Sequence, residues 1–169
     1  QYGLARDEYI DTDHWRNQLY IREGRRMVGE FVATQKDLQT ERTKPDAIGM
    51  GSYNSDSHNV QRFVNEKGFV ENEGDVQVPV KPYQLPYRSL TPKRNEAVNL
   101  LVPVCFSASH IAYSSMRMEP QYMILGHAAG VAAALAVEHS SPVQEIPVAE
   151  LQKRLRSQGA IFEYGAEHQ

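Results

Sequence analysis

Four polar side chains are the candidates for chemistry in this sequence. His110 follows an apolar run, and loop residues that follow a buried strand commonly face a cleft, so His110 is the first candidate for acid–base chemistry. Arg117 stands just before a long apolar segment, at the position where a buried strand and a loop would deliver it to the N-terminus of a helix. His58 could exchange a proton or contact a substrate, although a turn histidine bonded to Asp56 is the alternative. Arg88 could clamp a carboxylate, with a structural salt bridge as the alternative.

The segment that follows Arg117 predicts one helix, over residues 119–138. Pro120 suits the first helical turn, and the acidic residue before it suits the positive N-terminal end of a helix. Gly126 and Gly130 each cost about 1 kcal/mol relative to alanine inside a helix, so the sequence must have a reason to keep them. A flat ligand or another backbone pressed against the helix is one reason, and tight internal packing without a ligand is the other.

The apolar run before this helix predicts the element that positions its N-terminus. Residues 99–104 read as a continuous strand of the kind that is buried on both faces of a parallel sheet. A polar loop over residues 107–115 would join this strand to the helix. Free N–H groups and partial positive charge gather at such a helix N-terminus, which suits a phosphate, a carbonyl oxygen or an anionic ring.

The first part of the chain predicts mainly extended structure. Alternating apolar and polar residues predict strands over 19–22 and 26–33, and a hairpin is predicted to turn at residues 65–68. Residues 76–86 carry three prolines and predict an edge strand or a linker, followed by a short strand at 87–90.

The predicted fold class is therefore α/β, in the sense of a mixed α+β chain. Residues 1–98 form the β-rich, substrate-side segment of this prediction, and residues 99–169 form the strand–helix part. The second part ends in an amphipathic helix over residues 147–157, with Val148, Leu151 and Leu155 facing inward and Gly159 closing it.

Composition restricts the classes of partner. The 169 residues carry 18 Lys and Arg against 21 Asp and Glu, a net charge of −3, which argues against a nucleic-acid surface. Cys105 is the single cysteine, so an internal disulfide and a C-x-x-C metal site are excluded, and no metal is expected. Polar residues interrupt every apolar run that approaches the ~20 residues of a membrane span, so no span is expected. This cysteine usage fits either the cytoplasm or the periplasm.

Several runs resemble the C-terminal part of a bacterial family of FAD-dependent oxidoreductases, some of whose members carry the provisional label xanthan lyase. The resemblance covers about residues 4–162. The runs that carry it are Leu19–Met27, Tyr53–Asn59, Pro82–Pro92, Asn99–Val104, Ser107–His110 and Arg117–Pro120.

The resemblance implies a flavin cofactor. In this class of protein the N-terminus of a helix with a Gly-x-Ala-Ala-Gly core faces the pyrimidine edge of the isoalloxazine ring, and Gly126, Ala129 and Gly130 match that core. The resemblance also implies that Val104, Cys105 and Phe106 lie along the ribityl chain. Arg117 and His110 would lie near the ring or the substrate. The implied reaction is hydride transfer to the flavin from a polar substrate, which could be carbohydrate-like.

The sequence lacks one part of a complete FAD site. No G-x-G-x-x-G fingerprint occurs, since Gly49-Met50-Gly51 is followed by Asn54 where the third glycine should stand. The chain also starts without methionine. We therefore expect a piece of a longer flavoprotein, whose N-terminal FAD-binding part is its main partner. The piece alone is expected to be colourless and inactive, and homo-oligomerisation is left open.

Two other functions compete with this interpretation. A polysaccharide lyase or hydrolase could use Ser107 or Ser109 with His110, or Tyr113 as a base, but no G-x-S-x-G elbow occurs. A non-catalytic binding module built around the alanine-rich helix is the second alternative. Flavin binding and flavin reduction would separate these functions.

Overall fold

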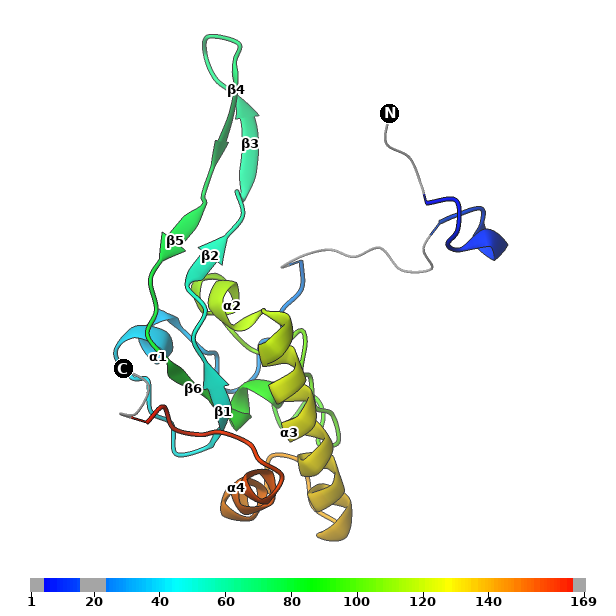
Figure 1. Ribbon diagram of the computed structural model, residues 1–169, viewed down its shortest axis with the longest axis vertical. Helices are drawn as coiled ribbons and strands as arrows, with labels where there is room; N and C mark the ends of the chain where they lie inside the picture. The colour runs from blue at the N-terminus through cyan, green and yellow to red at the C-terminus, as the bar shows by residue number, and fades with distance from the viewer. Residues whose placement is uncertain (1–4, 16–23, 166–169) are drawn as a thin grey trace.

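The computed structural model describes residues 5–15 and 24–165. Twelve elements form in that part of the chain, and Figure 1 shows their arrangement. The helices are α1 (Gln35–Gln39), α2 (His110–Met116), α3 (Glu119–Glu138) and α4 (Val148–Ser157), with 3-10 turns η1 (Ile10–Thr12) and η2 (Tyr87–Leu90). The strands are β1 (Ala47–Gly51), β2 (Ser55–Ser57), β3 (Gln61–Val64), β4 (Val70–Glu73), β5 (Val76–Val78) and β6 (Tyr83–Pro86).

The strands form three antiparallel pairs, β1–β6, β2–β5 and β3–β4. The pairs are nested. β1, β2 and β3 follow one another outward along the chain, and β4, β5 and β6 return beside them, so the two stretches form one long antiparallel ribbon (Figure 1). The outermost pair is the predicted hairpin, with Val64 opposite Val70 and a turn at Gly68, whose φ is +83°. Both of its strands are exposed along their whole length, and the hairpin projects from the body of the protein.

The hydrophobic core lies at the other end of the ribbon, where the helices pack on β1 and β6. α3 has the bounds that the sequence predicts, and one of its faces supplies the core residues Leu125, Ala128, Ala132 and Leu135. α4 adds Leu151 and Leu155, both fully buried, and Gly159 ends this part of the chain with a φ of +86°. The mixed α+β class and the two principal helices are thus confirmed, whereas the division at residue 98 stays a prediction.

α3 is also long and apolar enough to cross a membrane by length and composition. About a third of its most apolar window is buried inside the protein, and core helices of soluble proteins pass the same test. The expected absence of a membrane span stays a prediction.

The predicted strand at residues 99–104 is wrong. This segment is irregular, and Leu100 and Val104 are 48% and 49% exposed. A strand of a parallel sheet needs at least one parallel neighbour along its length, and the one parallel contact in the described part of the chain is a single bridge between Ala33 and Ala108. The fold class is corrected accordingly, because no buried parallel strand delivers the chain to α3 within the residues that the structure describes.

Two further local predictions are wrong, and one lies outside the described residues. Residues 87–90 form the turn η2 instead of a strand, because the Ser89 hydroxyl donates to the Pro86 carbonyl at 2.7 Å and stabilises a tight turn. The predicted loop at 107–115 contains helix α2. The strand predicted at 19–22 lies outside the described residues.

The strand predicted at residues 26–33 does not form either, although this segment lies along the chain that enters α2. Met27 N–H donates to the Cys105 carbonyl, and Ala33 N–H donates to the Ser107 carbonyl. The Gly29 N–H donates to the Ser107 side chain and not to a neighbouring strand, and a Cβ at Gly29 would lie 2.5 Å from the Thr91 carbonyl oxygen.

Candidate functional site

Arg117 lies at the corner where α2 ends and α3 begins. Ser109 starts α2 by accepting a hydrogen bond from the Ala112 N–H on its side-chain oxygen, and Arg117 ends it with its own N–H bonded to the Tyr113 carbonyl. The Arg117 side chain is buried and donates from Nη2 to the Asp56 carbonyl in β2 at 2.8 Å. The guanidinium is therefore fixed between β2 and the start of α3.

A buried polar cluster holds this corner against the sheet. The Tyr83 hydroxyl lies 2.7 Å from the Ser115 Oγ, which also donates to the Tyr53 carbonyl. Gln121, in the first turn of α3, donates from Nε2 to the Ser115 carbonyl at 3.2 Å. We did not predict this cluster from the sequence. The signal that could have indicated it is the pair of small polar residues Ser114 and Ser115, shortly before Arg117.

Burial raises the pKa of Tyr83 to about 12, against the lowering effect of its contacts with Ser115 and Gln121. The folded protein therefore binds more protons than the unfolded chain above about pH 10, and we expect its unfolding free energy to fall as the pH rises through that range. Tyr83→Phe should lower stability at neutral pH by about 1 kcal/mol and reduce the alkaline loss. Denaturant titrations from about pH 8 to 11.5 measure both effects. Burial also raises the pKa of Tyr87, so Tyr87→Phe should reduce the alkaline loss in the same way. An unchanged alkaline slope in Tyr83→Phe would contradict the prediction.

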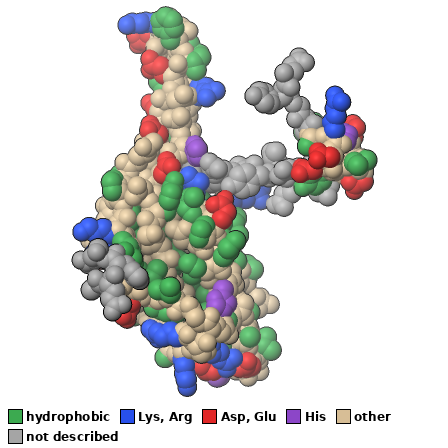
Figure 2. Space-filling view, viewed as in Figure 1, with side chains coloured by type: hydrophobic (Ala, Val, Ile, Leu, Met, Phe, Trp, Pro, Cys, Tyr) green, Lys and Arg blue, Asp and Glu red, His purple; other side chains and the backbone are tan. Residues whose placement is uncertain are grey.

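The N-terminus and the outer face of α3 are open. The N-cap residue of α3, Met118, makes no side-chain hydrogen bond to the backbone N–H groups of the first turn. A Cβ added at Gly126 or at Gly130 would meet nothing within 4 Å. Met123 and Val137 on the same face are 75% and 79% exposed. Figure 2 shows uncharged and hydrophobic atoms along α3, whereas charged side chains gather below it, around α4.

Ala129 has a different position from the two glycines of the predicted core. It is buried and belongs to the hydrophobic core, whereas Gly130 is exposed and Gly126 is half-buried. Gly126 and Gly130 therefore leave the solvent-facing surface of α3 flat, whereas buried alanines such as Ala129 let the opposite face of α3 pack closely on the core.

His110 lies apart from Arg117, at the other end of α2. His110 is the first residue of α2 and Arg117 follows its last, so about 10 Å of helix separates them. His110 is half-buried, and its Nε2 is buried with no hydrogen-bond partner among the described residues. His58 is exposed and lies two residues beyond Asp56, whose carbonyl binds Arg117.

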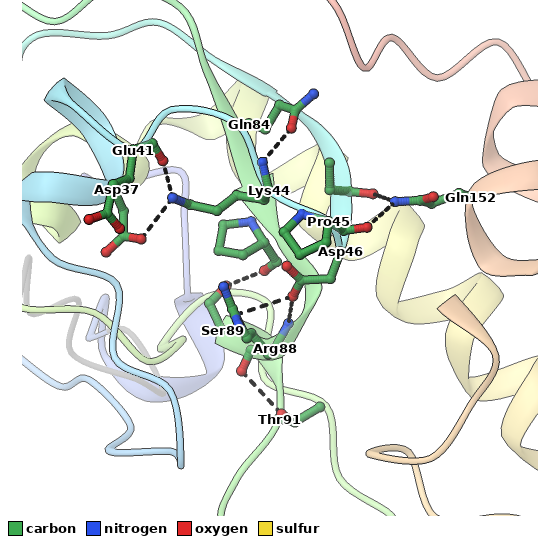
Figure 3. A network of polar contacts seen from close by, with 12 residues as sticks. Asp37, Glu41, Lys44, Pro45, Asp46, Gln84, Arg88, Ser89, Thr91 and Gln152 are labelled. Atoms are coloured by element: carbon green, nitrogen blue, oxygen red, sulfur yellow. Dashed lines mark hydrogen bonds and ion pairs between the residues drawn. The ribbon is translucent and has the colours of Figure 1, made fainter. Parts of the chain in front are cut away.

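Arg88 belongs to a separate polar network, which Figure 3 shows. Its Nε lies 3.5 Å from the Asp46 carboxylate, its backbone N–H donates to the same oxygen, and its guanidinium stacks over the Phe31 ring at 4.1 Å. The same network holds Lys44, which is buried and lies 2.9 Å from Asp37. Arg88 thus has a structural carboxylate partner and does not join the cluster around Arg117.

The residues predicted along the ribityl chain have mixed positions. The Val104 carbonyl accepts a hydrogen bond from the Tyr113 hydroxyl at 3.1 Å, and the Cys105 carbonyl accepts one from Met27. Phe106 is fully buried, with its ring 5.0 Å from that of Tyr113. Of the three predicted residues, Val104 has the most exposed side chain.

The residues that a lyase or hydrolase would use have structural contacts in this fold. The Ser107 Oγ accepts a hydrogen bond from the Gly29 N–H, and the Ser109 Oγ caps α2. The Tyr113 hydroxyl lies 2.9 Å from the Tyr122 hydroxyl. In the described part of the chain, no group of three or more His, Cys, Asp and Glu side chains could hold a metal ion.

Comparison with known proteins identifies the class. The family model described as FAD dependent oxidoreductase matches residues 2–155, which is most of the chain. The chain belongs to this family of FAD-dependent oxidoreductases. No curated protein and no solved structure matches the chain.

The residues present fit one side of a flavin. The open positions at Gly126 and Gly130 leave the space that a flat ring system needs, and α3 has an N-terminus without a side-chain cap next to a fixed cation, Arg117. The sequence offers no glycine fingerprint for the pyrophosphate. The residues of this chain therefore fit the isoalloxazine ring of FAD, whereas no matching site for its adenosine end occurs in the sequence.

Proposed function

We propose that this chain supplies the ring-side half of the flavin site of an FAD-dependent oxidoreductase. The observation that carries the proposal is the open face of α3, where two helical glycines have nothing within 4 Å of a Cβ position. Each glycine costs helix stability of about 1 kcal/mol, and no contact among the described residues explains that cost. A ring that approaches the helix surface would explain it.

The electrostatics of the corner favour an electron-rich ring. The N-terminal end of a helix carries about half a positive charge, and Arg117 adds a full charge beside it. Both groups are fixed before any ligand binds, because the guanidinium is bonded to β2 and the helix is packed on the core. Such preorganised charge stabilises negative charge that develops during a reaction.

Gly126 and Gly130 would hold the ring, and Val104 would lie beside it. When bound, the flavin supplies the acceptor for a hydride from a carbon–hydrogen bond of a polar substrate, which could be carbohydrate-like. Arg117 would orient the substrate or the ring. His58 would accept the substrate proton, since it follows the β2 segment that binds Arg117.

His110 is the second candidate for the proton. Its buried Nε2 without a partner among the described residues would gain a hydrogen bond from a ligand. We keep Arg88 as a more distant candidate for a substrate carboxylate, because its side chain is 46% exposed despite its contact with Asp46.

In this proposal the other half of the site would come from outside this sequence. Leu100 and Val104 are half-exposed in a segment whose sequence is typical of a buried strand, and the glycine face of α3 is open. A parallel sheet that carries the dinucleotide fingerprint would cover the segment at residues 99–104, and the flavin that it binds would cover the glycine face of α3. We therefore propose that the N-terminal FAD-binding part of a longer protein is the partner of these surfaces.

Flavin titration tests the proposal. The 169-residue chain alone should bind FAD weakly, and a longer chain with the fingerprint should bind it stoichiometrically and be bleached by its substrate. Absorbance near the flavin bands measures both. Stoichiometric FAD in the 169-residue chain, or turnover by the longer chain without flavin, would contradict the proposal.

Substitution of the proton acceptor should have a large effect in the flavin-containing enzyme. We expect His58→Asn to lower the rate of flavin reduction by about 10²-fold or more, because the asparagine amide cannot accept the substrate proton. Anaerobic stopped-flow reduction measures the rate. Arg62→Gln, on the exposed strand β3, is the control. If His110→Asn has the larger effect and His58→Asn has none, the roles of the two histidines are reversed.

A further inference from the structure

A cavity lies on a different side of α3 from the open glycine face. Its volume is about 510 Å³, and it opens between β1, the middle of α3 and the segment that follows α4. Ile48, Met50, Ile124 and Ile161 contribute apolar walls, and His127 and Gln158 add a polar pair with 2.5 Å between Nε2 and Oε1. This size is within the range of small-ligand sites in proteins.

The backbone of β1 presents an unused donor and acceptor at this cavity. β1 pairs with β6 along one edge, with Met50 opposite Gln84. The Gln84 N–H donates to the Arg42 carbonyl on the far side, so Met50 and Gln84 form a non-hydrogen-bonded pair of the antiparallel ladder. The N–H and C=O of Met50 therefore point away from β6, and no hydrogen bond to them is found among the described residues.

An amino-acid residue in extended conformation complements such an edge. Its own N–H and C=O point to the same side, so it can exchange both hydrogen bonds with Met50. Its neighbouring side chain would then enter the apolar part of the cavity. A flat apolar molecule without an amide would leave both backbone groups of Met50 without partners.

The charge of the cavity restricts the ligand further. Glu163 is the one charged side chain in its lining, and no Lys or Arg lines it in the part of the chain that the structure describes. A basic group next to the extended residue would lie near this carboxylate. An acidic ligand would meet it unfavourably.

We propose that this cavity binds a short extended peptide that adds to the edge of β1, with a large aliphatic side chain in the pocket and a basic residue beside it. The site is separate from the proposed flavin face and does not depend on it. It gives this family member a peptide-recognition site in addition to its redox site.

The test uses the 169-residue chain and the probe N-acetyl-Val-Leu-Lys-methylamide. In ¹⁵N-resolved NMR titrations we expect saturable shifts confined to the amides of residues 48–52 and 158–164. The valine of the probe is the residue that pairs with Met50 when the leucine side chain enters the pocket. Replacing the valine amide by an ester removes the donor to the Met50 carbonyl and should weaken binding by about tenfold. Replacing the lysine by glutamate should weaken it by a smaller factor.

Variants of the protein separate specific binding from unspecific contact. Ile161 is 69% exposed, so the Ile161→Asp variant should fold normally. It should lower the affinity for the probe by about tenfold or more. Val60→Asp, at a residue 61% exposed on the far hairpin, is the matched control and should leave binding unchanged. The proposal is overturned if no saturable shift occurs at residues 48–52, or if Ile161→Asp binds the probe as tightly as the original chain.

Discussion

Gly126→Ala and Gly130→Ala should each stabilise the isolated chain and weaken flavin binding in the complete enzyme. Both positions lie inside α3, and the added methyl group meets nothing within 4 Å. Alanine is favoured over glycine in a helix by about 1 kcal/mol, so the unfolding free energy should rise by that amount. Denaturant titration of the 169-residue chain measures it.

The same substitutions should lower flavin affinity by about tenfold each, because a methyl group would occupy the space that we assign to the ring. Loss of flavin absorbance during dialysis of the longer, flavin-loaded protein measures the affinity. The opposite signs of the two effects are the diagnostic result. If the glycines only served internal packing, both substitutions would destabilise the isolated chain.

Gly49→Ala is the matched control for the glycine series. A Cβ at this position would lie 2.3 Å from the Ile124 Cγ2, where β1 packs on α3. We expect this substitution to destabilise the isolated chain by about 1–3 kcal/mol. A stabilising effect there would show that the geometry of the β1–α3 contact is wrong, and the open space at Gly126 and Gly130 would then no longer support a ring on this helix.

The elements that could be predicted from sequence are those with local signals. α3 begins at an acidic residue and a proline, and it ends where the apolar periodicity ends. The β3–β4 hairpin turns at Gly68, whose positive φ a glycine adopts readily. In α4 the spacing of Leu151 and Leu155 already identifies the buried face.

The strand predicted at residues 99–104 was wrong because its signal was not local. An apolar strand of a parallel sheet is stabilised by neighbouring strands, and its own residues do not reveal whether those strands are present. Within the described residues the segment pairs with no sheet. Its exposed side chains, Leu100 and Val104, are what the sequence pattern would bury.

The candidate site was predictable only through its motif residues. Arg117 and the glycines of α3 stand in recognisable runs, and the structure brings Arg117 to the start of the helix. The cluster that fixes this corner joins Tyr83 to Ser115 across 32 positions. Nothing in the spacing of these two residues predicts that contact, because it depends on how α2 packs against the strands.

Lys44→Met should be strongly destabilising, although Lys44 lies outside the site. The Lys44 side chain is 3% exposed and its Nζ lies 2.9 Å from the Asp37 Oδ1, while the second oxygen of Asp37 accepts bonds from the Thr34 N–H and hydroxyl. Removing the lysine leaves a buried carboxylate without its counter-charge, which typically costs about 3–5 kcal/mol. Denaturant titration at about pH 7 measures the loss.

The pH dependence distinguishes loss of the ion pair from loss of packing. Burial alone would raise the pKa of Asp37, but the hydrogen bonds from Lys44 and Thr34 and the lysine charge lower it overall. A lowered pKa in the folded state gives stability that is present above the unfolded value of about 3.9 and is lost as the pH falls below it. The original chain should therefore lose stability more steeply between about pH 5 and 3 than Lys44→Met does.

Substituting both charges tests the same ion pair without leaving a lone buried charge. The double variant Asp37→Asn with Lys44→Met should recover part of the stability that Lys44→Met loses, because neither position then carries an unpaired charge. The asparagine that replaces Asp37 can still accept the capping bonds from Thr34 through its amide oxygen, so the start of α1 should persist. If the double variant is as unstable as the sum of the two single variants, the pair contributes through packing alone, and the acid sensitivity of the original chain must come from other carboxylates.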